Sequence, residues 1–339
     1  MKSKIALVFT ALIISFQLAA HPSWGIVVDK KRNIYFADIT HNGRGSVWKV
    51  TNEGELILLL QDFHAHNVNL DSEGNIVTAH GEMDEHYMVR LKKDGSIDTL
   101  VNANDYTIFN GGNSFYTPKG EIIFQAENYF WRLNEKGIRE KISDHKFEWN
   151  QTIFTDSKGN YYGPDIGDGK GQLVKIDPEG NATVIAENLI TKFDDRTYDK
   201  HNDVLMGITE GCEGNIYIAE LAGQRVIKVM EDGSTETYYK SEGNWEPSGL
   251  DFFAGDAYVL EYEDHHGLHG PQIVKIDEAG KKEIIFNYDQ YQKESTESVP
   301  TIENNSSNRP IWMYLLSGAL IILIVYWLIR NRRGTIKFY

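Results

Sequence analysis

One pattern recurs six times along the chain, and this repetition constrains the fold more than any other feature. GIVVDKKRNIYFADITHNGRGSVWKVTNEGELILLL returns as NVNLDSEGNIVTAHGEMDEHYMVRLKKDGSIDTLV, and four weaker copies follow. The six copies occupy residues 25–60, 67–101, 113–143, 152–186, 207–239 and 249–286. A fixed period of this kind indicates a repeat architecture, because each copy buries its apolar face against its neighbours.

Each copy contains four short β-rich runs joined by turns such as DSEGN and EDGS. Four-stranded units at intervals of roughly 40 residues are typical of propeller blades. An all-β sandwich would not explain why the same turns return in the same order. We therefore predict an all-β, six-bladed β-propeller over residues 21–287. Each blade is complete within its own repeat, so no strand is expected to be exchanged between the first and last blades.

Both ends of the chain have the character of membrane-targeting segments. Residues 1–20 combine Lys2 and Lys4, an apolar run and two small residues, as in a signal peptide. Residues 311–329 carry no charge and are long enough to cross a bilayer, with aromatic residues at both edges. The basic tail, 330–339, is expected in the cytoplasm. We predict a single-pass membrane protein with an extracytoplasmic (extracellular, periplasmic or lumenal) propeller, joined to the membrane by a polar stalk at 288–310.

The predicted ectodomain is strongly acidic. The whole chain has a net charge of −15, and the two ends hold six basic residues and no acid, so the remainder carries −15 − 6 = −21. Such a surface repels nucleic acid, which we exclude as a partner. Cys212 is the only cysteine, so no intramolecular disulfide is possible.

Histidines concentrate on one predicted face. Loops after second strands and approaches to first strands lie at the same end of a blade, called here the top face. All eleven histidines map to it: His21, His64, His66, His145 and His201 before first strands, and His41, His80, His86, His265, His266 and His269 after second strands. Loops on a rigid scaffold often carry function, although top loops are also simply longer and more polar.

His64 and His66 form an HxH pair at the start of the second blade. Side chains two residues apart in a strand point to the same side, so the two imidazoles form half of a zinc or copper site. His21, at the corresponding place in blade 1, is a candidate third ligand, and His201 another. Histidines at such positions also commonly bond a backbone carbonyl. Copper is expected only if the mature chain begins at His21 and its amine also binds, as in the lytic polysaccharide monooxygenases.

Three other strand starts hold oxygen ligands suited to calcium: Asn150, Asn202 with Asp203, and Glu246. Amide and carboxylate oxygens that converge on a propeller axis would bind a hard cation. Asn and Asp are also ordinary turn residues, so these positions have a purely structural explanation as well.

The runs DSEGNI, DSKGNY and EGNIYIAE resemble NHL-type repeats and the senescence marker protein/gluconolactonase family, over nearly the whole ectodomain. In gluconolactonases, Glu, Asn and Asp at inner-strand starts hold a divalent metal that polarises a lactone and activates water. The run NQTIFTDSKGNYYGPD is similar to the Asn-led strand of that family and implies that Asn150 is a ligand. HNDVLMGITEGCEGNIYIAE is similar to the Asp-led strand, which implies that Asp203 is a ligand and a base. The family's Glu opens blade 1, where this chain has HPSW; the comparable residue is Glu246.

Two classes of function follow. The first is a metal-dependent hydrolase of lactones or esters that uses calcium or zinc, with Asp203 and His64 as catalytic residues; a lyase similar to the peptidyl-amidoglycolate lyases, with three histidine ligands, is a further enzymatic alternative. The second is a non-catalytic propeller that binds a protein, peptide or glycan through top-loop aromatics such as Tyr87, Tyr106 and Phe109.

Overall fold

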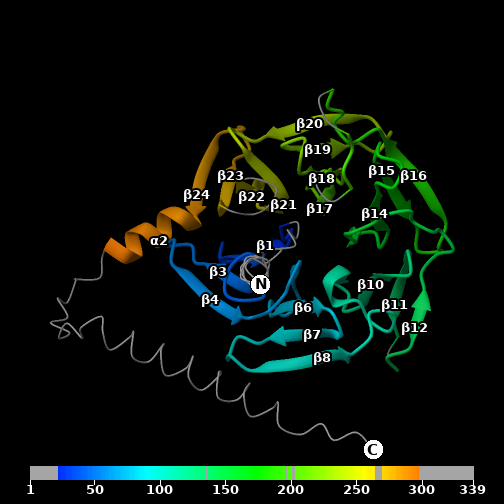
Figure 1. The fold of residues 1–339 in the computed structure, drawn as a ribbon, viewed down its shortest axis with the longest axis horizontal. Helices are drawn as coiled ribbons and strands as arrows, with labels where there is room; N and C mark the ends of the chain where they lie inside the picture. The colour runs from blue at the N-terminus through cyan, green and yellow to red at the C-terminus, as the bar shows by residue number, and fades with distance from the viewer. Residues whose placement is uncertain (1–21, 135, 195–196, 201–202, 264–268, 298–339) are drawn as a thin grey trace, which may run out of the picture. The chain divides into compact units, whose positions relative to one another are not determined.

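A computed structural model describes residues 22–134, 136–194, 197–200, 203–263 and 269–297 of the chain. It contains six four-stranded antiparallel sheets arranged in a ring (Figure 1). In every sheet the strands follow chain order from the axis outward. The predicted six-bladed propeller is confirmed, and the sandwich is excluded.

The strand bounds match the six repeats. Blades 1 and 2 comprise β1 (Ile26–Val28), β2 (Ile34–Asp38), β3 (Ser46–Val50), β4 (Leu56–Gln61), β5 (Val68–Leu70), β6 (Ile76–Glu82), β7 (Glu85–Leu91) and β8 (Ile97–Ala103). Blades 3 and 4 comprise β9 (Ser114–Tyr116), β10 (Ile122–Ala126), β11 (Tyr129–Leu133), β12 (Arg139–Lys141), β13 (Phe154–Thr155), β14 (Tyr161–Asp165), β15 (Gln172–Ile176) and β16 (Ala182–Glu187). Blades 5 and 6 comprise β17 (Leu205–Glu210), β18 (Ile216–Glu220), β19 (Arg225–Val229), β20 (Thr235–Lys240), β21 (Trp245–Phe253), β22 (Asp256–Glu263), β23 (His269–Ile276) and β24 (Lys282–Asn287).

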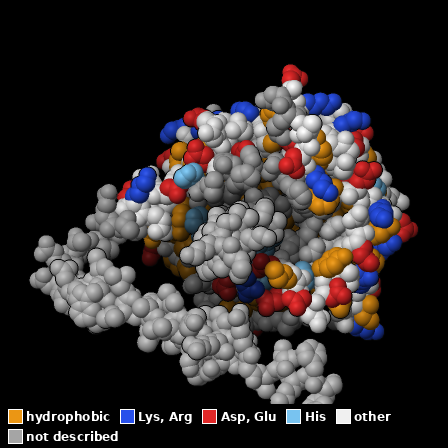
Figure 2. All heavy atoms as spheres, in the orientation of Figure 1, with side chains coloured by type: hydrophobic (Ala, Val, Ile, Leu, Met, Phe, Trp, Pro, Cys, Tyr) orange, Lys and Arg blue, Asp and Glu red, His pale blue; other side chains and the backbone are white. Residues whose placement is uncertain are grey.

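Burial explains the composition of these strands. Second strands such as β2 (IYFAD) and β18 (IYIAE) are buried at every position, because neighbouring blades cover both faces of the sheet. Fourth strands such as β16 and β20 are mostly exposed, because they form the rim. Figure 2 shows acidic and basic side chains interspersed around this rim.

The ring closes without strand exchange, as predicted. Blades 1 and 6 share one apolar cluster, which includes Ile26 and Phe36 from blade 1 and Tyr262 and Phe286 from blade 6. The backbone N–H of Val28 also donates to the Asp251 carboxylate at 2.8 Å. Side-chain packing, rather than a shared sheet, therefore joins the first and last blades.

A short helix, α2 (Tyr288–Glu297), follows β24 at the start of the predicted polar stalk. Tyr288 is buried, and its ring lies 4.1 Å from that of His41 and 5.8 Å from that of Trp48. The propeller unit extends to Gln292. The stalk interpretation is thus wrong for the first residues of this segment, because the aromatic face of Tyr288 and Tyr291 packs with Phe286 on the core of blades 1 and 6.

The predicted signal peptide (1–20), the membrane helix (311–329) and the tail (330–339) lie outside the described residues. Within the described ranges, no helix is both long and apolar enough to cross a membrane.

Candidate functional site

Five of the seven predicted ligand residues lie in the described part of the chain, at one end of the blades. His64 and His66 precede β5, Asn150 precedes β13, Asp203 precedes β17, and Glu246 is the second residue of β21. His21 and His201 lie outside the described residues.

His64 and His66 form a contact that we call the histidine pair. Their Nε2 atoms are 3.0 Å apart, and the two rings are perpendicular. His64 Nδ1 lies 3.0 Å from the carbonyl oxygen of Arg44, which can only accept, so Nδ1 carries the proton. In the neutral pair, His64 Nε2 is therefore the acceptor and His66 Nε2–H the donor. Two imidazole nitrogens on one tetrahedral zinc are about 3.3 Å apart, so the pair is close to a bidentate spacing.

His80 holds the backbone of the histidine pair in place. Its Nδ1 accepts a hydrogen bond from the His64 N–H at 2.9 Å, and its ring is stacked on Tyr87. Burial, together with the charge of Arg44 and with His64, lowers the pKa of His80 to about 4. His80 is therefore neutral at physiological pH, which leaves Nδ1 able to accept.

Asn113 and Asn150 form a second polar contact, called here the amide pair. Asn150 Nδ2 donates to Thr152 O at 2.9 Å and to Pro164 O at 2.8 Å. Two carbonyl acceptors fix the side-chain nitrogen on that side, so Oδ1 points the other way. Asn113 Nδ2 donates to the backbone oxygen of Asn150 at 3.4 Å. Both side-chain Oδ1 atoms are buried without a donor in the described part of the chain.

The two pairs are neighbours at the start of the inner strands of blades 2 to 4. Asn113 ends the short 3₁₀ turn η1 (Gly111–Asn113), and the central Gly112 of this turn faces the His66 ring. A Cβ on Gly112 would lie 3.8 Å from His66 Cδ2. His66 also stacks on Trp24, with ring centroids 4.9 Å apart. Gly112 thus places Asn113 next in the chain to the residue that faces the histidine pair, and Asn113 in turn contacts Asn150.

Asp203 and Glu246 belong to other parts of the top face. Asp203 is buried and accepts a hydrogen bond from the Asp199 N–H at 2.7 Å, and it lines a cavity of about 260 Å³ with Tyr198. Burial, with further contributions from Asp203 and other nearby carboxylates, raises the pKa of Tyr198 to about 12. Glu246 is buried in β21, opposite Tyr262 of β22.

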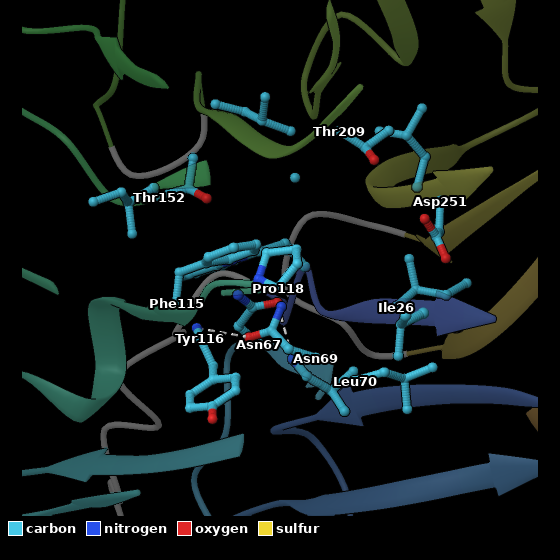
Figure 3. Close-up of a pocket in the computed structure, with 17 residues that line it drawn as sticks. Ile26, Asn67, Asn69, Leu70, Phe115, Tyr116, Pro118, Thr152, Thr209 and Asp251 are labelled. Atoms are coloured by element: carbon cyan, nitrogen blue, oxygen red, sulfur yellow. Dashed lines mark hydrogen bonds between the residues drawn. The ribbon is translucent and has the colours of Figure 1, made fainter. Parts of the chain in front are cut away.

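Below these groups, all six blades line an axial cavity of about 200 Å³ (Figure 3). Trp24 contributes to its wall, and so do Asn67 and Thr152. In Figure 3, Asp251 lies on the opposite side of the cavity from Thr152. Burial raises the pKa of the Asp251 carboxyl to about 6, against the opposing effect of the backbone N–H groups of Val28 and Phe252.

Within the described ranges, no three His, Cys, Asp or Glu side chains lie close enough together to hold a metal ion. The amide pair provides the better fit to a cation, because it offers two buried neutral oxygens for which the described residues supply no donor. The histidine pair beside it offers a nitrogen site for zinc.

The aromatic residues predicted to contact a partner behave differently from one another. Tyr106 is exposed. Tyr87 is half-buried and packs on Phe63 and His80. Phe109 is fully buried against Phe124, so its prediction as a contact residue is wrong; the hydrophobic core of blades 2 and 3 covers it.

Two polar residues that sequence reasoning missed are Asn113 and Asp251. Asn113 sits at an inner-strand start, like Asn150, and that position was the available signal. Asp251 lies inside a strand, in the run GLDFF, where nothing in the sequence distinguishes a cavity-lining carboxylate from an exposed one.

No family model matches this sequence, and no curated protein matches it either. Solved structures do match the fold. A virginiamycin B lyase from Staphylococcus aureus aligns with a TM-score of 0.51 at 16% identity, over 79% of this chain and 85% of that one. A gluconolactonase from Xanthomonas campestris aligns with a TM-score of 0.52 at 14% identity, over 71% and 83% of the two chains. A calcium-binding protein, regucalcin, from Agrobacterium tumefaciens aligns with a TM-score of 0.52 at 14% identity, over 71% of this chain and 82% of that one. The predicted resemblance to gluconolactonase-type propellers is therefore confirmed at the level of the fold.

Proposed function

We propose that this protein is a membrane-anchored, extracytoplasmic propeller that binds a divalent cation on its top face and hydrolyses a small lactone or ester. The amide pair beside the histidine pair is the observation that carries the proposal. Buried polar groups in folded proteins normally have partners, and each exception needs an explanation. Two buried amide oxygens that find no donor among the described residues are explained by a cation that they would coordinate.

The residues divide by chemistry. Asn113 and Asn150 supply hard oxygens suited to calcium, and His64 and His66 supply nitrogens suited to zinc. Asp203 and Glu246, the carboxylates of the sequence prediction, lie elsewhere on the top face, and His21 and His201 lie outside the described residues, so these four stay predictions from the sequence. When bound, the metal would polarise the carbonyl and lower the pKa of a water molecule.

With a cation held by the amide oxygens, His64 is the proposed proton acceptor, in keeping with its predicted catalytic role; with zinc on the histidine pair, its Nε2 would be a metal ligand instead. A proton enters His64 at Nε2, because Nδ1 already donates to the Arg44 carbonyl. The resulting imidazolium keeps that hydrogen bond, and the facing His66 Nε2 must then act as the acceptor, with its own proton moved to Nδ1. Asp203, the second predicted base, already accepts the Asp199 N–H through one oxygen.

The structural neighbours favour this reaction class. One of them is described as a gluconolactonase and another as a calcium-binding protein. Others are lyases that act on virginiamycin B or streptogramin B, which supports a lyase as the closest enzymatic alternative. The apolar segments at 1–20 and 311–329 support the membrane anchor.

The test is metal analysis of the purified full-length protein, followed by assays with a panel of lactones and aryl esters. We expect one calcium or zinc ion per chain and hydrolysis of at least one substrate. The His64→Gln variant should lose hydrolysis, either together with the bound metal ion or while keeping it. His145→Gln is the matched control, since His145 also precedes an inner strand but packs on Phe147 instead. A metal-free protein that hydrolyses nothing overturns the proposal.

One observation favours the non-catalytic alternative. Three apolar side chains on top-face loops are exposed: Met83 at 88%, and Tyr106 and Ile108 each at 52%. Exposed apolar groups on loops suit contact with a protein, peptide or glycan. If the metal and hydrolysis assays are negative, replacement of Met83 and Tyr106 by serine should abolish partner capture while leaving the fold intact.

A further inference from the structure

A second site lies on the opposite, bottom face of the propeller. A cleft of about 980 Å³ runs between blades 1 and 2, which are neighbours in Figure 1. Five lysines line it, and we call it the lysine cleft: Lys30, Lys31, Lys49, Lys92 and Lys93. They come from the β1–β2 turn, from β3 and from the β7–β8 turn. This concentration of positive charge occurs in an ectodomain of net charge −21.

Most of this positive charge is not neutralised locally. In the described part of the chain, Lys30, Lys31 and Lys49 form no ion pair, whereas Lys92 pairs with Asp98 at 2.8 Å. Lys93 donates to the backbone oxygen of Glu73.

Three acids line the cleft, Asp29, Asp71 and Glu73, and the two aspartates accept hydrogen bonds within their own turns. Asp29 accepts hydrogen bonds from the backbone N–H groups of Lys31 and Asn33, from Asn33 Nδ2 and from the Tyr35 hydroxyl. Asp71 accepts three from its own turn and also pairs with Arg90 at 2.9 Å. Both aspartates are thus engaged by their turns or by Arg90, and the lining holds five lysines against three acids.

The floor of the cleft is apolar. Leu59, Leu70 and Leu91 line it, and all three are half-buried against the core cluster of blades 1 and 2. Lys49 Nζ lies 5.9 Å from the centre of the Tyr35 ring, at the wall. A ligand in this cleft thus meets both ammonium groups and leucine side chains in its lining.

The corresponding cleft between blades 3 and 4 shows that the repeat does not require this arrangement. Its volume is about 220 Å³. Its basic residues, Lys119 and Arg132, occur with the acids Glu121 and Asp156, so the charges balance. The lysine cleft therefore differs from the cleft between blades 3 and 4 in both size and charge.

We propose that the lysine cleft binds a small amphiphilic monocarboxylate, with its carboxylate at the lysines and its alkyl chain on the leucine floor. Charge complementarity selects an anion, and the half-buried leucines select a ligand with an apolar body. The inference does not depend on the proposed top-face activity.

The experiment measures protection of lysines in the full-length protein, in a neutral detergent. An amine-acylating reagent is applied with increasing octanoate, and acylation of each lysine is quantified by mass spectrometry. We expect octanoate to slow acylation of Lys30, Lys31 and Lys49 at least fivefold, with saturation. Lys119, Lys158 and Lys175, on blades 3 and 4, are the internal controls and should not change.

Three further probes identify what is recognised. Acetate and inorganic phosphate test for binding of an anion without an alkyl chain, and octanol tests for binding of the chain without a charge. None of the three should protect the lysines as octanoate does. Equal protection by any of them, or equal protection of the control lysines, would overturn the proposal.

A variant closes the test. Replacing Lys30, Lys31 and Lys49 together by glutamine should reduce octanoate affinity at least tenfold, read from the remaining protection at Lys92. The same replacement of Lys119, Lys158 and Lys175 should leave the affinity unchanged. If octanoate binds equally well to both triple variants, the lysine cleft is not the site.

Discussion

The bottom turns and the top-face strand starts of this propeller satisfy their polar groups in opposite ways. In the bottom turns, an aspartate accepts the N–H and the side-chain Nδ2 of an asparagine four residues later. This network recurs at Asp29–Asn33, Asp71–Asn75, Asp156–Asn160 and Asp177–Asn181. On the top face, the amide pair keeps two buried oxygens without a donor in the described chain.

This difference separates polar residues that stabilise the fold from polar residues that are free to bind a ligand. A buried polar group without a partner costs roughly 1–3 kcal/mol, so satisfied networks stabilise the native state and unsatisfied ones do not. The bottom turns close hairpins and repeat with the blades. The amide pair, at blades 3 and 4, closes no turn, and the described part of the chain supplies no donor for its two side-chain oxygens, as expected for residues that serve a ligand.

The largest predicted effect tests the bottom turns. Asp156 is buried and accepts hydrogen bonds from the Asn160 N–H, Asn160 Nδ2 and the Tyr162 hydroxyl. Asp156→Ala should lower the free energy of unfolding by about 3–5 kcal/mol, because three donors lose their acceptor. Asp177→Ala, in the more exposed turn of the same kind, should lower the free energy of unfolding much less, since water replaces the lost hydrogen bonds. Denaturation of the two variants measures both values, and equal losses would contradict this explanation.

An intermediate effect tests the axial cavity. The pKa of Asp251 is about 6 in the folded protein and near 3.8 when unfolded. The native state thus binds more protons between these values, and stability falls as the pH rises from about 4 to about 6. Asp251→Asn should raise the free energy of unfolding by about 1–3 kcal/mol at pH 7, with no gain at pH 3.5.

Melting temperatures of the Asp251→Asn variant at the two pH values provide the measurement. Asp144→Asn is the control, because the Asp144 side chain is fully exposed. The melting temperature of the Asp144→Asn variant should equal that of the unmodified protein at both pH values. A stabilisation by Asp251→Asn that did not depend on pH would show that burial of the carboxylate is not its cause.

The smallest effect on stability, and the sharpest contrast, concerns Asn113. Asn113→Leu should change the free energy of unfolding by less than about 1 kcal/mol, because an apolar group of similar shape replaces an amide with an unsatisfied oxygen. Cation affinity should fall at least about tenfold. Asn75→Leu should do the reverse, losing about 2 kcal/mol through the Asp71 turn while keeping cation affinity. Metal titration and denaturation of both variants decide whether the two faces differ in this way.

The sequence predicted the blades well because their determinants are local. Each hairpin is encoded by adjacent runs and by turn residues such as those of DSEGN, where Gly74 adopts a φ of +75°. The top-face location of His64, His66 and Asn150 followed from topology alone. The segment after residue 287 was misjudged because Tyr288 and Tyr291 stand in a polar context, and their apolar partners lie in blades 1 and 6.

By itself, therefore, the sequence determined the number of blades, the four strands of each blade and the face of the propeller, top or bottom, on which each polar loop residue lies. Only the tertiary structure decided which of those residues meet: His64 with His66 and His80, Asn113 with Asn150, and five lysines with three leucines across two blades. The reason is physical. Hairpins depend on contacts between residues close in the chain, whereas cavities arise from packing between blades, which no single repeat encodes.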